Sequence, residues 1–246
     1  MSDLETDLLI RDLATQDDYL ACLRLQDETW GSTFSERVPP AILRVSQKIG
    51  GVSAGAFDSS ARMIGFVFGM TGVRDRRLVH WSDMLAVREE YRGHHIGRAL
   101  KEYQRDKVRA LGVETMLWTY DPLVAANAHF NINRLGARPV EYVPDMYGSN
   151  TGSALHGALP TDRFIVAWDL TGEPRAAGRG PSDTARVELP ADFAALQRND
   201  PEAALRWRLR VREVIQGHWA RGYRVSGFVR ATDNEPPHYL LTPTGQ

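Results

Sequence analysis

The chain has 246 residues, of which 43% are hydrophobic and 25% charged, a balance typical of globular proteins with a buried core. Thirty basic and 31 acidic residues give a net charge of −1, which argues against a nucleic-acid partner. The single cysteine excludes an internal disulfide framework and a multi-cysteine metal site. The acidic N-terminus and the absence of a long apolar run lead us to expect a cytoplasmic protein with no membrane partner.

Hydrophobic periodicity predicts alternating strands and helices over the first 170 residues. In chain order the expected elements are a strand at 8–13, helices at 15–29 and from Pro39 to Gly50, strands at 52–57, 63–70 and 79–87, a helix from about Gly97 to Gly112, a strand at 115–120, a short helix at 125–135, and strands at 140–143 and 164–168. This order, β-α-α-β-β-β-α-β-α-β-β, predicts an α/β layer fold with a partly antiparallel sheet.

The helix that begins near Gly97 has a clear amphipathic pattern. Its expected buried face carries Ile96, Ala99, Leu100, Tyr103 and Leu111. The expected solvent face carries Arg98, Lys101, Glu102, Arg105 and Arg109. Lys107 falls within the apolar arc, and its long stem allows its charge to reach water.

Residues 171–186 contain three glycines and two prolines and have little to bury, so we expect a linker there. It divides a first domain, residues 1–170, from a C-terminal extension, residues 187–246. The extension reads as a strand near 187–189, a helix at 201–221 and a pair of strands at 223–229 and 238–242, docked on the first domain or on a partner subunit. Arg208 and Arg212 intrude on the apolar arc of its helix, which predicts ion pairs with acidic residues across that interface or, as the alternative, contact with an anionic substrate.

The chemistry is expected in the segment from Met84 to Leu100, where a strand, a turn and a helix follow one another. Such a turn directs backbone N–H groups and the positive end of a helix dipole toward one place. Gly93 and Gly97 allow a ligand to approach the backbone closely, because they have no Cβ. Arg92 and Arg98 add charge-assisted donors, so a pyrophosphate is the natural occupant.

The residues Leu85, Val87, Tyr91, Arg92-Gly93, Ile96-Gly97-Arg98-Ala99-Leu100 resemble the acyl-CoA-binding motif of the GNAT superfamily of N-acetyltransferases. That motif, Q/R-x-x-G-x-G/A, falls on residues 92–97, and the predicted element order over residues 8–168 is also similar. The resemblance implies a mixed, mostly antiparallel central sheet flanked by helices. It also implies acetyl-CoA or another acyl-CoA as cofactor, and no metal.

The resemblance places cofactor contacts residue by residue. The backbone at Leu85, Ala86 and Val87 would pair with the pantetheine arm, and these strand residues would face 115–120 across a splayed slot. The pyrophosphate would be held by the turn, comprising Arg92, Gly93, His94, His95, Ile96, Gly97 and Arg98. His95 stands where the motif has its middle glycine, so we expect weakened cofactor binding. Adjacent histidines without a carboxylate cluster are not expected to bind a metal ion.

Proton transfer is harder to assign, because the tyrosine that serves many GNAT relatives as general acid is replaced by Ile132. Asp83 is a candidate base, with a purely structural carboxylate as the alternative; strand alternation is expected to place it on one face with Leu85 and Val87 and to place His80 and Ser82 on the other. His129 is a further base candidate, and Tyr147 is a substitute acid. Amides that could contact the cofactor are those of Asn127, Asn131 and Asn133.

Four segments, 121–123, 132–137, 146–148 and 159–164, together with the C-terminal extension, resemble a longer, predicted-acetyltransferase branch of the superfamily. That resemblance implies acylation of amino acids, with succinyl-CoA as a further donor. Asp162 and Arg163 would then read the amine and the carboxylate of the acceptor, or else form structural ion pairs.

The predicted activity is N-acyl transfer from an acyl-CoA to the amine of a small molecule such as an amino acid, by direct attack on the thioester. The alternative is a catalytically inactive CoA-binding or ligand-sensing module, for which His95 and Ile132 argue. A homodimer stays open through the apolar helix of the extension.

Overall fold

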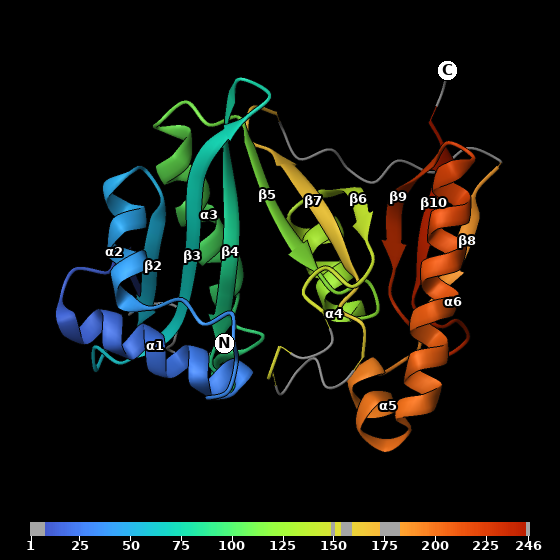
Figure 1. The fold of residues 1–246 in the computed structure, drawn as a ribbon, viewed down its shortest axis with the longest axis horizontal. Coiled ribbons are helices and arrows are strands. Elements are labelled where there is room, and N and C mark those ends of the chain that lie inside the picture. The colour runs from blue at the N-terminus through green and yellow to red at the C-terminus, as the bar shows by residue number, and fades with distance from the viewer. Residues whose placement is uncertain (1–7, 149–150, 154–158, 173–182, 245–246) are drawn as a thin grey trace. The chain divides into compact units, whose positions relative to one another are not determined.

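The structure, a computed structural model, describes residues 8–148, 151–153, 159–172 and 183–244 (Figure 1). Their contacts form two compact units. The first comprises residues 8–117 with 152–153, and the second comprises residues 118–148 and 151 with the described residues from 159 onward. Most of the predicted linker, residues 173–182, lies outside the described residues, so the domain boundaries at 170 and 187 stay predictions.

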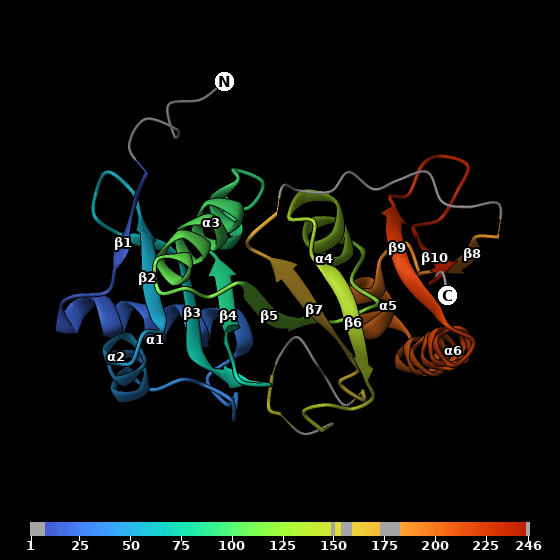
Figure 2. The same ribbon diagram turned by 90° about the horizontal axis from the view of Figure 1, so that it is seen from above.

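The first unit is built on an antiparallel meander of four strands and three helices. Its elements are β1 (Leu9–Asp12), α1 (Gln16–Trp30), α2 (Pro40–Lys48), β2 (Val52–Phe57), β3 (Met63–Arg74), β4 (Arg77–Val87) and α3 (Ile96–Arg109). Strand β5 (Thr115–Tyr120) begins parallel to β4 in this unit and runs on into the second. Figure 2 shows α3 on the opposite side of the strands from α1 and α2.

The second unit contains the other strands of the large sheet and a smaller sheet of its own. Its elements are α4 (Ala125–Ala128), a π-helical turn (His129–Arg134), β6 (Arg138–Val143), β7 (Arg163–Asp169), β8 (Ala185–Glu188), α5 (Phe193–Asn199), α6 (Pro201–Ala220), β9 (Tyr223–Val229) and β10 (His238–Pro243). The large sheet has the order β1-β2-β3-β4-β5-β7-β6 and the small one β8-β10-β9. The predicted mixed, mostly antiparallel fold with an α+β extension is therefore confirmed, while α5 was not expected.

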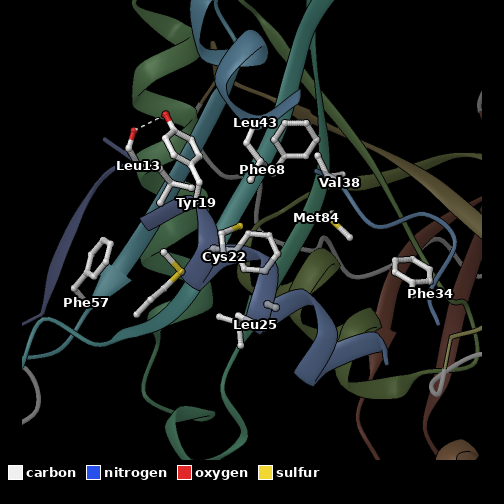
Figure 3. Packing of buried hydrophobic residues seen from close by; sticks show 13 residues of the cluster. Leu13, Tyr19, Cys22, Leu25, Phe34, Val38, Leu43, Phe57, Phe68 and Met84 are labelled. Atoms are coloured by element: carbon white, nitrogen blue, oxygen red, sulfur yellow. Dashed lines mark hydrogen bonds between the residues drawn. The ribbon is translucent and has the colours of Figure 1, made fainter. Parts of the chain in front are cut away.

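The core of the first unit lies between α1, α2 and the strands (Figure 3). Helix α1 starts with a capping box in which Thr15 accepts from the backbone of Asp18. Arg11 donates two hydrogen bonds to Asp18, of 2.7 and 2.9 Å, which lower the pKa of that carboxyl. With its N-terminus fixed, the helix packs apolar side chains, including Cys22 and Leu25, against Phe66 and Phe68 of β3.

The buried face of α3 differs from the predicted one. Ile96, Leu100, Gln104 and Val108 are buried at intervals of four residues, but Lys101 is also buried, with 2% of its surface exposed, whereas Leu111 is 50% exposed. The expectation that Lys101 faces solvent is wrong, because β4 offers its ammonium a polar partner below the helix. Lys101 Nζ donates to Ser82 Oγ over 2.7 Å.

Lys101 belongs to a buried polar cluster between α3, β3 and β4. Thr71 donates its hydroxyl proton to the carbonyl of Gly50 at 2.6 Å, so Thr71 Oγ1 accepts from His80 Nδ1 at 2.9 Å. Burial, followed by the charge of Lys101, lowers the pKa of His80 to about 3. His80 is thus neutral, with the lone pair of Nε2 directed into the cluster.

Gly69 of β3 leaves the room that this cluster needs. A Cβ there would lie 2.3 Å from His80 Nε2 and 2.6 Å from the carbonyl of Trp81. We expect Gly69→Ala to lower the free energy of unfolding by about 1–3 kcal/mol, since the backbone must shift. Gly72→Ala, in the same strand with nothing within 4 Å, is the control and should change it by less than about 1 kcal/mol. Equal urea midpoints for the two variants would contradict this packing.

The predicted ion pairs of the long C-terminal helix are confirmed within the second unit. Arg208 donates two hydrogen bonds of 2.6 Å to Asp121, and Arg212 donates to Asp162 at 2.9 and 2.6 Å. Burial would raise the pKa of Asp121, but the charges of Arg208 and Arg163 and the hydrogen bonds lower it. Helix α6 is therefore joined to residues that follow β5 and precede β7.

Arg208 tests this connection, because breaking one partner leaves a buried charge. Arg208→Gln should cost about 3–5 kcal/mol of unfolding free energy, which thermal and urea denaturation measure. Arg206→Gln, two residues away with its side chain 68% exposed, is the matched control and should leave stability nearly unchanged. If both variants unfolded at the wild-type midpoint, the Arg208–Asp121 pair would have no part in holding α6.

Candidate active site

A β-bulge in β4 organises the candidate site. Phe68 of β3 pairs with Met84, but Gly69 pairs with Ser82, so Asp83 is an extra residue with no partner in the register. Neighbouring residues of β3 point to opposite faces, and therefore Ser82 and Met84 do as well. Ser82 points toward α3, and Met84 belongs to the core under α1 and α2.

This bulge overturns one expectation about Asp83. Leu85 and Val87 pair with Val67 and Gly65, on the face toward α3, where a Cβ on Gly65 would meet Leu100 and Ile96. Asp83 instead accepts a hydrogen bond from Trp81 Nε1, at 3.3 Å, on the α1 and α2 face. Asp83 thus does not share a face with Leu85 and Val87, although it does lie opposite His80 and Ser82 as expected.

The pairing of β4 with β5 ends just before the bulge. Its register runs from Val79 opposite Thr115 to Trp81 opposite Leu117. Within the described part of the first unit, no strand pairs with this edge of β4 from Ser82 to Val87. Backbone N–H and C=O groups on such an edge need partners, which an extended ligand with amide groups can supply.

The edge leads directly into the predicted phosphate turn. A 3₁₀ turn (Glu89–Tyr91) follows β4, the chain then takes positive φ at Gly93 (86°) and His95 (61°), and α3 starts at Ile96 without a side-chain cap. The first N–H groups of the helix consequently have no partner in the helix itself. Residues 92–95 are all exposed, so the donors are open to a ligand.

His95 stands where the motif has a glycine, and its backbone has the left-handed conformation that glycine adopts most easily. Its left-handed backbone costs an ordinary residue about 1–2 kcal/mol, though histidine is among the side chains found there more often. The His95 side chain is exposed rather than packed into the turn. Exposed backbone donors, with Arg92 and Arg98 beside them, are the groups that an anion would contact at this turn.

Electrostatics make Asp83 a stronger base than an ordinary aspartate. Although Asp83 is exposed, partial desolvation by the surrounding atoms raises the pKa of its carboxyl, the hydrogen bond from Trp81 lowers it, and the negative charge of Glu36 raises it again. Glu36 lies in the segment between α1 and α2, where sequence patterns offered no motif to single it out.

The other predicted site residues belong to the second unit. His129 Nδ1 contacts Asn133 Nδ2 at 3.0 Å, and desolvation followed by the charges of Arg230 and Arg134 lowers the pKa of His129. The Tyr147 hydroxyl lies 3.1 Å from Thr119 Oγ1, and the guanidinium of Arg163 stands over its ring at 5.4 Å. His129 and Tyr147 thus interact with different residues.

The asparagines and the Asp162–Arg163 pair also have defined positions. Asn127 is exposed, whereas Asn131 is buried and its Oδ1 accepts from Trp118 Nε1 at 2.9 Å, which favours a structural role. Asp162 is fully buried and is bonded by Arg212 and by the Tyr142 hydroxyl at 2.5 Å. Arg163 lies 3.5 Å from Asp121. The ion-pair alternative for Asp162 and Arg163 is therefore the one that the structure contains.

The described residues include no group of three or more histidine, cysteine or acidic side chains placed to hold a metal ion. Nor do they include a helix long and apolar enough to cross a membrane.

Comparisons with known proteins agree with this geometry. Residues 20–135 match the model of the Acetyltransferase (GNAT) family, and no curated protein matches the chain. Among solved structures, a chain of the NatC complex bound to Gag peptide and CoA matches with a TM-score of 0.54 at 18% identity, over 68% of this chain and 100% of its own. The ribosomal-protein-S18-alanine N-acetyltransferase of Escherichia coli matches at 0.51 and 18%, over 68% and 96%. Aminoglycoside 6'-acetyltransferase type Ii matches at 0.51 and 17%, over 68% and 99%.

These findings confirm the GNAT resemblance and the fold. The similar structures are covered almost completely, whereas about a third of this chain extends beyond the match.

The phosphate turn can be tested by CoA binding. Arg92→Glu should weaken it by tenfold or more, because one charge-assisted bond is worth roughly 1.5–3 kcal/mol and a tenfold change is about 1.4 kcal/mol. Gly97→Trp should weaken binding similarly by crowding the start of α3. Arg77→Glu, an exposed reversal at the far end of β4, is the control. Calorimetry giving one affinity for all four proteins would remove the turn from the site.

Proposed function

We propose that this chain, which carries a GNAT acetyltransferase domain at residues 20–135, transfers an acyl group from an acyl-CoA to the amine of a small molecule. The observation that carries the proposal is the continuity of three features in the first unit: the bulge at Asp83, the free edge of β4, and the turn that opens α3. Together they offer a base, a binding edge for amides and an anion site within sixteen consecutive residues, 83–98.

Binding uses groups that the chain already holds in place. The turn donors, with Arg92, His94, His95 and Arg98 around them, hold the pyrophosphate. The backbone of Leu85, Ala86 and Val87 bonds the amides of the pantetheine arm. This arrangement directs the thioester toward the bulge, because the strand edge and the turn are consecutive. Asn127, exposed on α4, remains a further candidate for a cofactor contact.

Proton transfer completes the reaction. A bound acyl-CoA supplies an activated thioester carbonyl. The Asp83 carboxylate accepts a proton from the incoming ammonium, which leaves a nitrogen lone pair free to form the C–N bond while the C–S bond breaks. The nitrogen, positively charged once the C–N bond has formed, releases its second proton to water, and the departing sulfur keeps the electron pair of the C–S bond and takes a proton from Tyr147, from His129 or from water. Since Ile132 occupies the usual tyrosine position, solvent is sufficient for this last step.

Acetyl-CoA is the donor we favour and succinyl-CoA is the second candidate. Amino acids are among the acceptors to be tested, and we place the reaction in the cytoplasm, with a homodimer as one possible assembly. The rival function, CoA binding without turnover, is motivated by His95 and Ile132.

A two-step experiment separates these functions. The protein is titrated calorimetrically with CoA, acetyl-CoA and succinyl-CoA, and thiol release is then followed with pooled primary amines. Micromolar binding with amine-dependent thiol release supports the transferase and identifies its donor. Binding without release supports the sensing module, and no binding of any of the three contradicts both.

Replacing Asp83 tests its proposed role as base, because we expect the substitution to lower activity and not to lower stability. Asp83→Asn should lower kcat by about 10²- to 10⁴-fold, the usual worth of a general base. Wild-type activity should fall as the pH drops through the raised pKa of Asp83, and the variant should lose that limb.

The same substitution should raise the melting temperature only slightly, because Asp83 is exposed and solvent screens most of the cost of its charge. When folding raises the pKa of a carboxyl, the ionised carboxylate lowers the free energy of unfolding, and this cost is fully present at pH values above the raised pKa. Asparagine removes this cost at neutral pH. A variant with wild-type kcat, or one that is both inactive and less stable, would show that Asp83 is a structural carboxylate.

A further inference from the structure

Two anchors on opposite faces of β4 lie on either side of Asp83. On the face toward α3, Lys101 Nζ donates to Ser82 Oγ at 2.7 Å, and both side chains are buried. On the other face Met84, 6% exposed, packs in the core under α1 and α2, as Figure 3 shows. Asp83 is the residue between these two anchors.

Regular alternation cannot satisfy both anchors. Residues two apart in an unbroken strand point to the same face, so Ser82 and Met84 would both lie toward α3 or both lie toward the core. The first arrangement takes the methionine out of the core, and the second separates the serine hydroxyl from the ammonium. An extra residue between them meets both requirements, and the register of β4 with β3 places Asp83 there.

The residues of β4 that precede the bulge are fixed on the face toward α3. His80 lies two residues before Ser82 on this face, and its Nδ1 donates to Thr71 Oγ1 at 2.9 Å. The strand is thus held by polar contacts up to Ser82, and by apolar packing from Met84 to Ala86 on the other face. The change of face is therefore confined to one residue.

Helix α3 carries both this polar anchor and the phosphate turn. Its first residue, Ile96, follows the turn and lies 3.4 Å from the position of a Cβ on Gly65, which pairs with Val87 at the end of the free edge. Lys101, farther along the helix, contacts Ser82 at the start of that edge. Helix α3 thus contacts the sheet near both ends of the edge.

A buried amine is a costly way to attach a helix to a sheet. Desolvation lowers the pKa of Lys101 well below its ordinary value. An apolar side chain of similar length would fill the same place without this cost. Only a donor, however, bonds the hydroxyl of Ser82 and so favours the bulged strand over a regular one. The polar contact therefore adds specificity of register rather than stability.

We propose that Lys101 is a positioning residue for the reaction: through Ser82 it holds the β-bulge that presents Asp83 to the amine. This inference rests on the proposed function and adds to it a residue that touches neither cofactor nor amine. Without the bond, β4 can return to regular alternation, which would turn Asp83 toward α3. The loss should appear in kcat, because the phosphate turn itself stays at the start of α3.

Ser82→Thr and Ser82→Val test the bond, because the two new side chains have nearly the same shape and only one has a hydroxyl. With acetyl-CoA and an amine that the wild type acylates, Ser82→Val should lower kcat by about 10²-fold, since a displacement of about 1 Å can cost that much. The KM for acetyl-CoA should change little. Ser82→Thr should keep most of the wild-type kcat. Equal kcat in the two variants, or a change confined to the KM for acetyl-CoA, would overturn the proposal.

Lys101→Met should lower kcat in the same way without lowering stability. Folding removes water from the ammonium, and this cost is present at neutral pH because it disappears only as the pH rises toward the ordinary pKa of lysine. We therefore expect a melting temperature at least equal to that of wild type. Lys107→Met, on the same helix with its side chain 47% exposed, is the control and should keep the wild-type kcat. Wild-type kcat in Lys101→Met, or a loss of activity matched by a lower melting temperature, would contradict the proposal.

The register of β4 can be measured without turnover, so the anchor and the proposed function can fail separately. Nuclear Overhauser contacts should place Gly69 opposite Ser82 in the wild type and in Ser82→Thr. In Ser82→Val and Lys101→Met, Gly69 should instead contact Asp83, as in regular pairing. If the register changes in this way while the wild type acylates no amine, the anchor stands and the transferase fails. If all four proteins have the same register, the anchor is wrong even when an amine is acylated.

Discussion

One inserted residue in β4 determines how the candidate site is arranged. Without the bulge at Asp83, strict alternation would place that carboxylate on the face toward α3, beside Leu85 and Val87. With the bulge, the backbone edge of β4 is available to the cofactor. Asp83 lies on the opposite face from His80, Ser82 and the buried polar cluster, where it is available to the amine. The pairing of β4 with β5 ends at Trp81, two residues before Asp83, so the free edge begins where the carboxylate is presented. Binding of a cofactor and activation of an amine thereby use the same short strand from two directions.

Hydrophobic periodicity and turn residues were sufficient to predict the order of elements up to β7, the turn at 92–98 and the ion pairs of Arg208 and Arg212. These depend on local chemistry, namely glycine at positive φ, amphipathic spacing, and the need of a buried guanidinium for an anion. The errors arose where tertiary structure decides. Lys101 is buried because Ser82 lies beneath it, and Asp83 changes face because its own strand, β4, bulges where it pairs with β3. The charge of Glu36 acts on Asp83 only when the segment between α1 and α2, held by Gln26, is folded onto β4.

Within the second unit, the C-terminal extension is joined to the residues that precede it by charge as well as by apolar packing. Asp121 follows β5, Asp162 precedes β7, and α6 supplies one arginine to each. Because Arg163 also approaches Asp121 and stands over the Tyr147 ring, the same network reaches the residue considered as a substitute acid. About a third of the chain lies outside the match with the similar acetyltransferases, and the ion pairs connect α6 to the residues that follow β5 and precede β7 in the large sheet.

The central claim is that the edge of β4 and the turn before α3 form one acyl-CoA site. Amide NMR of the 27.6 kDa protein during titration with CoA tests it most directly. The account predicts saturable shifts concentrated at the backbone N–H groups of 83–87 and 93–98, with the largest at the start of α3. Saturable shifts centred on other elements, or no saturation at millimolar CoA, would contradict it.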